Sequence, residues 1–504
     1  MKNIKKIGLL IAFISVFAAC KKDAPSISLS TEKELLTFRL EAASNAGLET
    51  AVVAEVGESE IEFQVPAGTA LNGLVATFTF KGEKVLIGNT EQQSGETAND
   101  FSKAITYVVY AEDGSTRNYK VEASVAEEPQ AAMAVARISI QTDGGVPVLT
   151  KDYLDGDIKV EAIGDYAAFE ASTRIKGRGN STWGYDKKPY KIKLDKKASL
   201  LGFKEAREFV LLANYLDGTL MLNAVAMKAG QLIGLPYTNT IVPVDLTING
   251  VYMGSYSLTE QVEVHENRVA VKDGGVLLEL DTYFDEPFKF SSSGYNLPVM
   301  VKYPALEDYS SSEANAELEK IQSEFEAMEQ LVKDASFPGN DYQDKIDRES
   351  LVKYLIIYNL TDNEEINHPK SIYMHKSKGG KYTMGPLWDF DWAYGYEQGN
   401  KHFDSFSHPL FWSNRPSSGN AFFTRLLQDP DIRGLYRQRW NEFRSDHLPK
   451  LLTYVTEYAE TISESQQRDY SLWKRGNGFA QDVAKLRAWL ENRAGYIDSY
   501  TASW

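Results

Sequence analysis

Cysteine is almost absent from this sequence: Cys20 is the only one among 504 residues, so no disulfide can form within the chain. The six histidines form no His-Glu-x-x-His motif and no Cys/His set, which argues against a zinc site. The Gly-x-Ser-x-Gly motif of serine hydrolases and the Walker A motif of P-loop proteins are also missing. These absences argue against several common active sites.

Positive charge is in deficit, with 54 Lys and Arg residues against 70 Asp and Glu residues, a net charge of −16. This balance argues against nucleic acid as a partner of the whole chain. Hydrophobic residues make up 43% and charged residues 25% of the sequence, as in soluble globular proteins. The length exceeds what one hydrophobic core supports, so we expect two or three domains.

Residues 1–19 have the pattern of a secretion signal, because lysines precede an apolar stretch that is too short to span a bilayer. The stretch ends in two alanines followed by Cys20, which resembles a bacterial lipobox. The resemblance implies cleavage before Cys20 and lipidation of that residue. We therefore expect an extracytoplasmic lipoprotein anchored in the outer membrane, facing the periplasm or the cell surface. An ordinary signal peptide with an incidental cysteine is the alternative.

Residues 25–126 contain short runs of alternating apolar and polar residues separated by turns. This spacing predicts a small, antiparallel, all-β sandwich. The segments around Pro66 and Asp113 resemble the immunoglobulin-like modules at the N-terminus of many Bacteroidetes surface lipoproteins, which implies a spacer or a binding domain. Residues 127–134 have the composition of a linker. The clearest alternating runs are residues 36–40, 61–65 and 105–109.

A strongly basic segment follows: between Arg174 and Lys197 the chain has nine Lys or Arg residues and two Asp residues. The pattern predicts two strands joined by a turn in which Gly177 and Gly179 let the backbone approach a ligand closely. On the second strand, alternation should turn Tyr190, Ile192 and Leu194 to one face and Lys191 and Lys193 to the other. The N–H groups of such a turn, with the polar side chains of residues 180–182, can hold phosphate oxygens. A solvated basic hairpin is the alternative, and a nucleic-acid patch is less favoured because aromatic residues are few.

Two carboxylates lie one residue apart in the stretch from Trp388 to Trp392. If this stretch ends a strand, alternation sends Asp389 and Asp391 to one face and the aromatic residues to the other. Converging carboxylates need a cation, and Mg²⁺ is the common one. Solvated turn acids beside core aromatic residues are the alternative. Upstream, the spacing of apolar residues predicts helices over residues 312–334 and from residue 347, and then a hairpin over residues 371–384.

A family resemblance runs through the second part of the chain. The basic segment from Arg178 onward and four later segments, in the same order, resemble the CotH family of atypical kinase-like proteins. The resemblance covers residues 135–445 and implies an α+β fold, with an atypical protein-kinase-like domain after the all-β immunoglobulin-like sandwich. Residues 446–504 would be a helical extension of that domain. The four later segments begin at Asn214, Gly250, Gly275 and Val301.

The resemblance implies ATP and Mg²⁺ or Mn²⁺ as cofactors and assigns roles by position. Asp362 matches a catalytic-loop Asp that orients or deprotonates the acceptor hydroxyl. Asp389 matches the metal-binding Asp, so we expect both residues to be catalytic. Asp391 would hold a second ion or a lysine. The nucleotide would be bound by Arg178, Gly179, Asn180, Ser181, Lys188, Lys191, Lys193 and Glu260.

The sequence departs from the family pattern at one position, because Lys370 and Ser371 stand where a metal-binding Asn is expected. Asn363 or Asn367 could substitute from nearby. Asn367 fits better, because four residues separate it from Asp362, as in the catalytic loop of protein kinases. A chain that lacks the second metal ligand could be an inactive pseudokinase.

Three functions follow from these patterns. The first is a kinase that transfers phosphoryl from ATP to a Ser or Thr of an envelope protein, or to another hydroxyl acceptor. The second is a catalytically inactive surface-binding or scaffold lipoprotein. The third is an enzyme acting on surface glycans, because the separation of two carboxylates cannot be read from sequence. The expected partners are the membrane, through Cys20, and an envelope protein or glycan, without nucleic acid.

Overall fold

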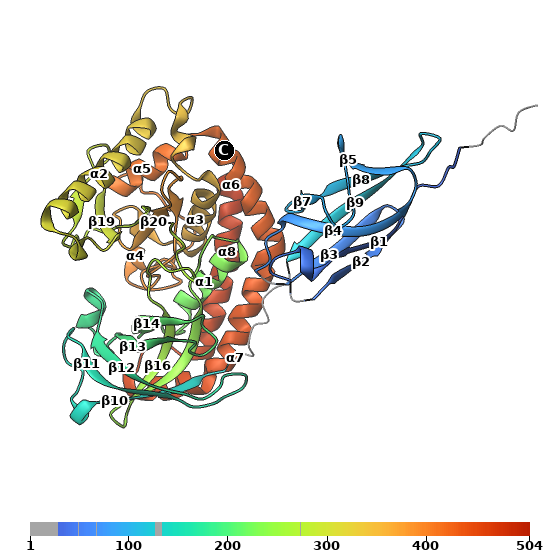
Figure 1. Ribbon diagram of the computed structural model, residues 1–504. Coiled ribbons are helices and arrows are strands. Elements are labelled where there is room, and N and C mark those ends of the chain that lie inside the picture. The colour runs from blue at the N-terminus through green and yellow to red at the C-terminus, as the bar shows by residue number, and fades with distance from the viewer. Residues whose placement is uncertain (1–28, 49, 67, 126–133, 273) are drawn as a thin grey trace, which may run out of the picture. The chain divides into compact units, whose positions relative to one another are not determined.

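The computed structural model describes residues 29–48, 50–66, 68–125, 134–272 and 274–504. The expected signal peptide, Cys20 and residues 127–133 of the expected linker lie outside these ranges. The chain divides into two compact units, Met1–Gln130 and Ala131–Trp504, both drawn in Figure 1. Within the described ranges, no helix is both long enough and apolar enough to cross a membrane.

The small unit is an all-β sandwich, as the alternating runs predict. Alternate side chains point inward, and the rings of Phe38 and Tyr107 meet in its core at a centroid distance of 5.4 Å. One pairing differs from the expected antiparallel pattern, because β9 lies parallel to β3. The described strands are β1 (Glu34–Leu40), β2 (Val52–Val56), β3 (Glu60–Val65), β4 (Asn72–Lys81), β5 (Lys84–Ile87), β6 (Thr90–Glu91), β7 (Ala98–Asp100), β8 (Ile105–Tyr110) and β9 (Thr116–Val125).

The large unit begins with a closed barrel in the order β10-β11-β12-β13-β14-β16-β15. Its interior confirms the predicted alternation of β13: Tyr190, Ile192 and Leu194 are buried, whereas Lys191 and Lys193 point outward. The basic segment is therefore one face of a barrel wall. The strands are β10 (Ala136–Thr142), β11 (Leu154–Val160), β12 (Phe169–Gly177), β13 (Tyr190–Ala198), β14 (Ala206–Leu212), β15 (Ile241–Ile248) and β16 (Val251–Glu260).

A second sheet, in the order β18-β19-β17-β20-β21, lies in a helical lobe next to the barrel (Figure 1). The two predicted helices are α2 (Ser311–Lys333) and α3 (Arg348–Thr361). The predicted hairpin is formed by β20 and β21, which pair in antiparallel orientation. Residues on nearly every side of α3 are buried, so it forms the centre of this lobe. The strands are β17 (Val276–Leu280), β18 (Lys289–Ser291), β19 (Pro298–Tyr303), β20 (Ile372–Lys376) and β21 (Thr383–Met384).

The C-terminal helices join the two lobes of the large unit. Helix α7 packs against strand β16 of the barrel and against α1, and α8 packs against α3 (Figure 1). Because α8 contributes buried Leu486, Trp489, Leu490 and Ile497 to the core of the helical lobe, it belongs to the same packed body. The remaining helices are α1 (Leu222–Leu232), α4 (Tyr396–Gly399), α5 (Ser418–Leu426), α6 (Pro430–Glu442), α7 (Leu448–Trp473) and α8 (Phe479–Ala502).

Candidate active site

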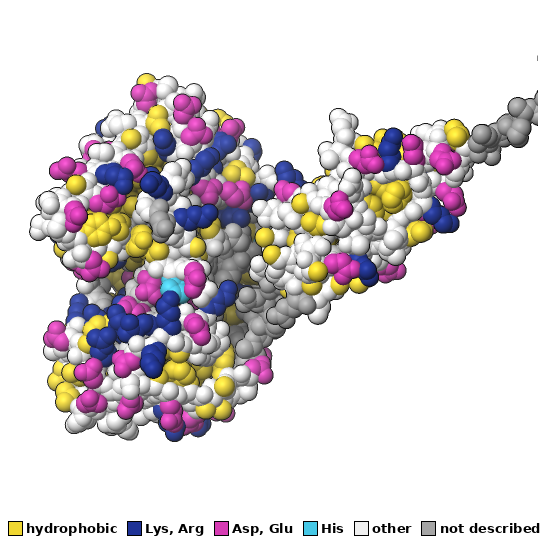
Figure 2. Space-filling view, viewed as in Figure 1, with side chains coloured by type: hydrophobic (Ala, Val, Ile, Leu, Met, Phe, Trp, Pro, Cys, Tyr) yellow, Lys and Arg dark blue, Asp and Glu magenta, His cyan; other side chains and the backbone are white. Residues whose placement is uncertain are grey.

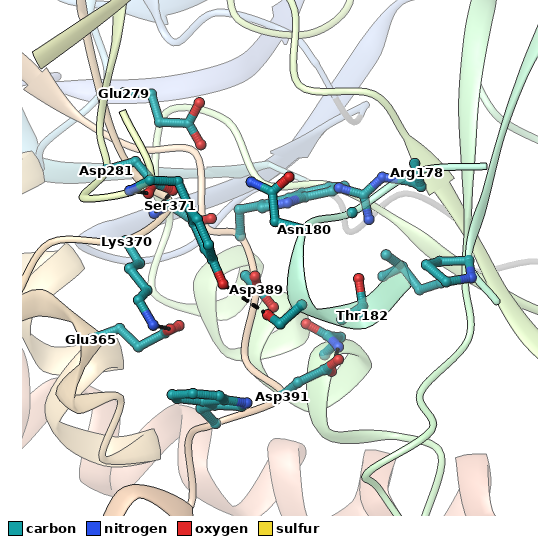
Figure 3. A pocket seen from close by; sticks show the side chains of 18 of the residues that line it. Arg178, Asn180, Thr182, Glu279, Asp281, Glu365, Lys370, Ser371, Asp389 and Asp391 are labelled. Atoms are coloured by element: carbon teal, nitrogen blue, oxygen red, sulfur yellow. Dashed lines mark hydrogen bonds and ion pairs between the residues drawn. The ribbon is translucent and has the colours of Figure 1, made fainter. Parts of the chain in front are cut away.

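A cavity of about 230 Å³ opens between the barrel and the second sheet. Its walls come from segments far apart in the sequence, which include residues 178–182, 279–286, 370–373 and 388–392. Figure 3 shows side chains from these segments turned toward a common space. In Figure 2, Lys and Arg side chains gather on the barrel lobe beside the groove that separates the lobes. The fold thus brings the basic loop and the acidic stretch together.

The glycine loop, residues 178–182, is the first part of the connection from β12 to β13 (residues 178–189), and its conformation depends on Gly177 and Gly179. A Cβ atom at residue 177 would lie 2.2 Å from the ring of Trp183. The ring can therefore pack on the backbone only because Gly177 has no side chain. Gly179 has a φ of 86° and would place a side chain 2.0 Å from the hydroxyl of Thr182. Both positions therefore require glycine, for close packing at the first and for a left-handed conformation at the second.

The glycine loop is bonded across the cavity to the segment that follows β17. The amide of Asn180 donates to a carboxylate oxygen of Asp285 at 3.1 Å. The hydroxyl of Tyr283 donates to the hydroxyl of Ser181 at 3.0 Å. Both contacts are exposed, so a ligand with stronger hydrogen-bond acceptors could replace them.

The two carboxylates of the acidic stretch both line the cavity, as expected, but the backbone is not a strand end. Asp389 has a φ of 62°, which turns the chain sharply at this residue. The aromatic residues therefore do not share the opposite face. Trp388 and Trp392 line the cavity beside the carboxylates, and only Phe390 is fully buried in the core. The expected alternation was wrong because it applies to extended backbone.

The electrostatic environment of these carboxylates favours a cation. Burial raises the pKa of Asp389, although Arg178 and Lys370 oppose the shift. Burial and the charge of Asp389 raise the pKa of Asp391 to about 7, and a hydrogen bond from Asn223, at 2.6 Å, opposes this. Carboxylate oxygens are the ligands that Mg²⁺ and Mn²⁺ prefer. The donor set of Asp389 and Asp391 therefore fits such an ion, which would offset the repulsion between the two carboxylates.

Among the charged residues of the cavity that the sequence did not single out are Glu279 on β17 and Lys302 on β19. The ammonium of Lys302 lies 3.3 Å from the carboxylate of Glu279 and also pairs with Glu286. The hydroxyl of Tyr373 donates to Glu279 at 2.6 Å. The available signal was a charged residue inside an otherwise apolar strand, since Glu279 lies between Leu278 and Leu280. Its meaning depends on the pairing of β17 with β19, which the sequence does not give.

Glu365 and Lys370 also line the cavity (Figure 3). The ammonium of Lys370 lies 3.7 Å from Glu365 and 4.4 Å from the ring centroid of Trp392. Burial, followed by the charge of Asp389, raises the pKa of Glu365 well above its usual range. Ser371, which follows Lys370, donates its backbone N–H to Asp281 at 3.1 Å. The position where a metal-binding Asn was expected thus presents an ammonium group to the cavity.

Four residues expected to bind the nucleotide do not line this cavity. The ammonium of Lys188 donates to the backbone carbonyl of Trp183 at 2.9 Å. Lys191 and Lys193 both pair with Glu208 on β14, at 2.5 Å each. Glu260 accepts a hydrogen bond from the backbone N–H of Thr240, and burial raises its pKa to about 7. Of the expected set, the cavity contains Arg178, Gly179, Asn180 and Ser181.

Asp362 does not line the cavity either. It ends α3 in a left-handed conformation, with a φ of 51°, and its carboxylate is completely buried. One oxygen accepts from the guanidinium of Arg493 at 2.9 Å, and the other lies 2.6 Å from the imidazole of His408. The loop therefore turns Asp362 away from the cavity, whereas Glu365, three residues later, reaches it.

Asn367 is likewise committed to holding loops together. Its amide group donates to the carbonyls of Glu364 and Leu410, and its side-chain oxygen accepts from the N–H of Trp412 and from Asn420. The side chain is completely buried. All of its hydrogen-bonding capacity is used, so in this structure it does not replace the expected metal-binding Asn.

Asp362, Glu364 and His408 form a second cluster with metal-ligand chemistry, since each offers one ligand atom and these atoms lie within 4.8 Å of one another. Arg493 already balances one of the two carboxylates. A protonated His408 balances the other, because its Nε2 lies 2.6 Å from Asp362 and 3.0 Å from Glu364. Burial lowers the pKa of His408, but hydrogen bonds to both carboxylates outweigh it and raise the pKa to about 9. A proton therefore neutralises this cluster more simply than a metal ion.

We expect His408→Gln to remove a pH-dependent part of the stability. Because the pKa is about 9 when folded and roughly 6.5 when unfolded, the contribution is complete below about pH 6.5 and is lost as the pH rises through about 9. Its full size is on the order of 3 kcal/mol. Calorimetric melting temperatures between about pH 6 and 10 should fall more steeply for the wild type than for the variant. Parallel plots of melting temperature against pH would contradict the proposed ion pairs of His408. The control is His265→Gln, because the pKa of His265 is lowered and not raised.

Comparison with known proteins adds a family and a domain type. The family model described as CotH kinase protein matches residues 175–497, and the model of the SGBP N-terminal domain matches residues 36–123. No curated protein matches the chain significantly. A candidate secreted protein from Bacteroides fragilis shares 14% identity, covering 19% of this chain and 97% of its own, with a TM-score of 0.15. A candidate glycoside hydrolase from Bacteroides thetaiotaomicron shares 16% sequence identity. The match covers 59% of this chain and 89% of the hydrolase, with a TM-score of 0.16. Both TM-scores are too low to support an argument.

Proposed function

The chain belongs to the CotH kinase family, whose model matches residues 175–497, and from this we propose that the large unit is a kinase. It would transfer a phosphoryl group from ATP to a hydroxyl group of an envelope protein or glycan. The observation that carries the proposal is the shared cavity, in which the glycine loop faces the carboxylates of Asp389 and Asp391. Phosphoryl transfer needs positioned groups and neutralised charge more than covalent chemistry, and this cavity offers both.

Each wall of the cavity has a role in this proposal. The backbone N–H groups of the glycine loop and the guanidinium of Arg178 would hold phosphate oxygens. Mg²⁺ or Mn²⁺ bound by Asp389 and Asp391 would neutralise the charge of the triphosphate. Glu365 takes the role that the sequence suggested for Asp362, because it is the carboxylate of that loop that reaches the cavity. It would orient the acceptor hydroxyl.

The direct test is phosphoryl transfer. The full chain is incubated with radiolabelled ATP and Mg²⁺ or Mn²⁺, alone and with an envelope extract. Label on the chain or on an extract component supports the proposal. The absence of any label, together with no change in melting temperature on adding ATP and metal, would refute it.

We expect Gly179→Ala to weaken nucleotide binding at least about tenfold, because the new side chain would clash with Thr182 and strain a φ of 86°. The nucleotide-induced rise in melting temperature would then need a correspondingly higher nucleotide concentration. Gly184→Ala is a matched control from the same connection, since a side chain there meets nothing within 4 Å. Equal nucleotide affinity in both variants would show that the loop does not hold the phosphates.

The match of residues 36–123 to the SGBP N-terminal domain supports a second candidate function, in which the small unit holds the chain on a surface glycan. We propose this as a partner activity of the kinase or, if no transfer is found, as the main activity. A glycan array probed with the full chain tests it. The proposed lipid anchor predicts that Cys20→Ser releases the chain from the membrane fraction.

A further inference from the structure

Lys370 places an ammonium group inside the proposed nucleotide site (Figure 3). Its nitrogen lies 3.7 Å from the carboxylate of Glu365. It also lies 4.4 Å from the ring centroid of Trp392 and 5.5 Å from that of Tyr283, so two aromatic faces stabilise the charge. Arg178 and, after it, Lys370 oppose the rise of the pKa of Asp389. Lys370 is therefore a held cation and not a mobile surface lysine.

The other lysines that line the cavity have different partners, and the remaining cation, Arg178, acts on Asp389 as Lys370 does. Lys302 pairs with Glu279 and Glu286. Lys187 is buried against Asp469, with which it pairs at 2.6 Å. These lysines are neutralised by their own carboxylates. Lys370 instead lies beside Glu365, and its charge acts on Asp389, one of the two proposed metal ligands.

This position has a consequence for the number of metal ions. Protein kinases neutralise the triphosphate with two Mg²⁺ ions, one of them held by an Asn and an Asp. An ammonium group has three donors and no acceptor, so Lys370 cannot be a metal ligand. At a separation of a few ångströms it repels a divalent cation strongly. The two candidate substitutes are both engaged elsewhere. Asn367 has its amide fully hydrogen-bonded, and Asn363 donates to the carbonyl of Asp389 and accepts from the N–H of Glu365.

We propose that Lys370 is an internal counter-ion that takes the place of the second divalent ion, so that a nucleotide binds with one metal ion and not two. The nucleotide part of this inference rests on the proposed kinase function. The electrostatic part concerns only Lys370 and the carboxylates around it. Removing the ammonium should therefore make the cavity a better metal site, with or without a nucleotide.

The first experiment measures Mn²⁺ alone, by the loss of the free-ion electron paramagnetic resonance signal during titration of the full chain. Lys370→Met is expected to bind Mn²⁺ at least about tenfold more tightly than the wild type, because a nearby positive charge is gone. Lys370→Arg, which keeps the charge, should stay within about twofold of the wild type. Lys378→Met removes an exposed lysine from the same hairpin and should also have no effect. Equal affinity in Lys370→Met and the wild type would overturn the proposal.

The second experiment counts ions by equilibrium dialysis against Mn²⁺ and a non-hydrolysable ATP analogue. We expect one Mn²⁺ per bound nucleotide in the wild type and two in Lys370→Asn, which offers an amide oxygen in place of the ammonium. Two ions in the wild type, or one ion in the Asn variant, would overturn the stoichiometry. If no variant binds the nucleotide but Lys370→Met still gains Mn²⁺ affinity, the kinase proposal fails while the role of Lys370 as an internal counter-ion stands.

Discussion

In the proposed kinase, Asp389→Asn is expected to reduce phosphoryl transfer at least about a hundredfold, because the amide replaces one of the two carboxylates proposed to bind the metal ion without changing the shape of the cavity. The same substitution should leave the melting temperature unchanged or raise it. Burial raises the pKa of Asp389 because a buried negative charge is unfavourable. A neutral amide at this position has no charge to bury. Initial rates with radiolabelled ATP and melting curves of the same preparation measure the two effects side by side.

The combination of lost activity and retained stability distinguishes a functional carboxylate from a structural one. Asp404→Asn is the matched control, because it removes the same charge from an exposed position outside the cavity. Its transfer rate should equal that of the wild type. Full activity in Asp389→Asn would show that the cavity is not the metal site of the proposed reaction, whatever the activity of the chain.

Local sequence patterns were sufficient where a residue's environment depends on its immediate neighbours. The alternation along residues 190–194 gave the buried and exposed faces of β13, and apolar spacing gave α2 and α3. The need for glycine at Gly179 also followed from the type of turn, whereas at Gly177 it comes from the packed ring of Trp183. In each case the period of a strand or helix, or the geometry of one turn, fixes where the side chain points.

Sequence reasoning was insufficient where the partner of a charge lies on another element. The exposed face of β13 was predicted, but Glu208 on β14, which neutralises Lys191 and Lys193, was not. Asp362 and Glu365 belong to one short loop, and the left-handed turn at Asp362 decides which of them reaches the cavity. One backbone conformation thus exchanges the positions of two carboxylates, and residue order alone does not reveal it.

Arg493→Met is expected to destabilise the large unit by about 3–5 kcal/mol, because it leaves the buried carboxylate of Asp362 without its cation. Arg493 is completely buried, and its guanidinium donates to the carbonyls of Asn359, Phe406 and His408 as well as to Asp362. Methionine has a comparable length but cannot donate any of these hydrogen bonds. Chemical denaturation monitored by tryptophan fluorescence measures the loss.

The cause of that loss can be isolated with a second substitution. In the background of Arg493→Met, Asp362→Asn should restore part of the stability, because the amide has no charge to leave unpaired. Lys485→Met, which removes an exposed lysine from the same helix α8, should change stability by less than about 1 kcal/mol. If Arg493→Met cost no more than this control, the ion pair would not hold α8 against α3. The predicted loss of stability would show that Asp362 has a structural role, although its loop faces the cavity. Its partner, Arg493, lies on a helix more than a hundred residues later in the chain.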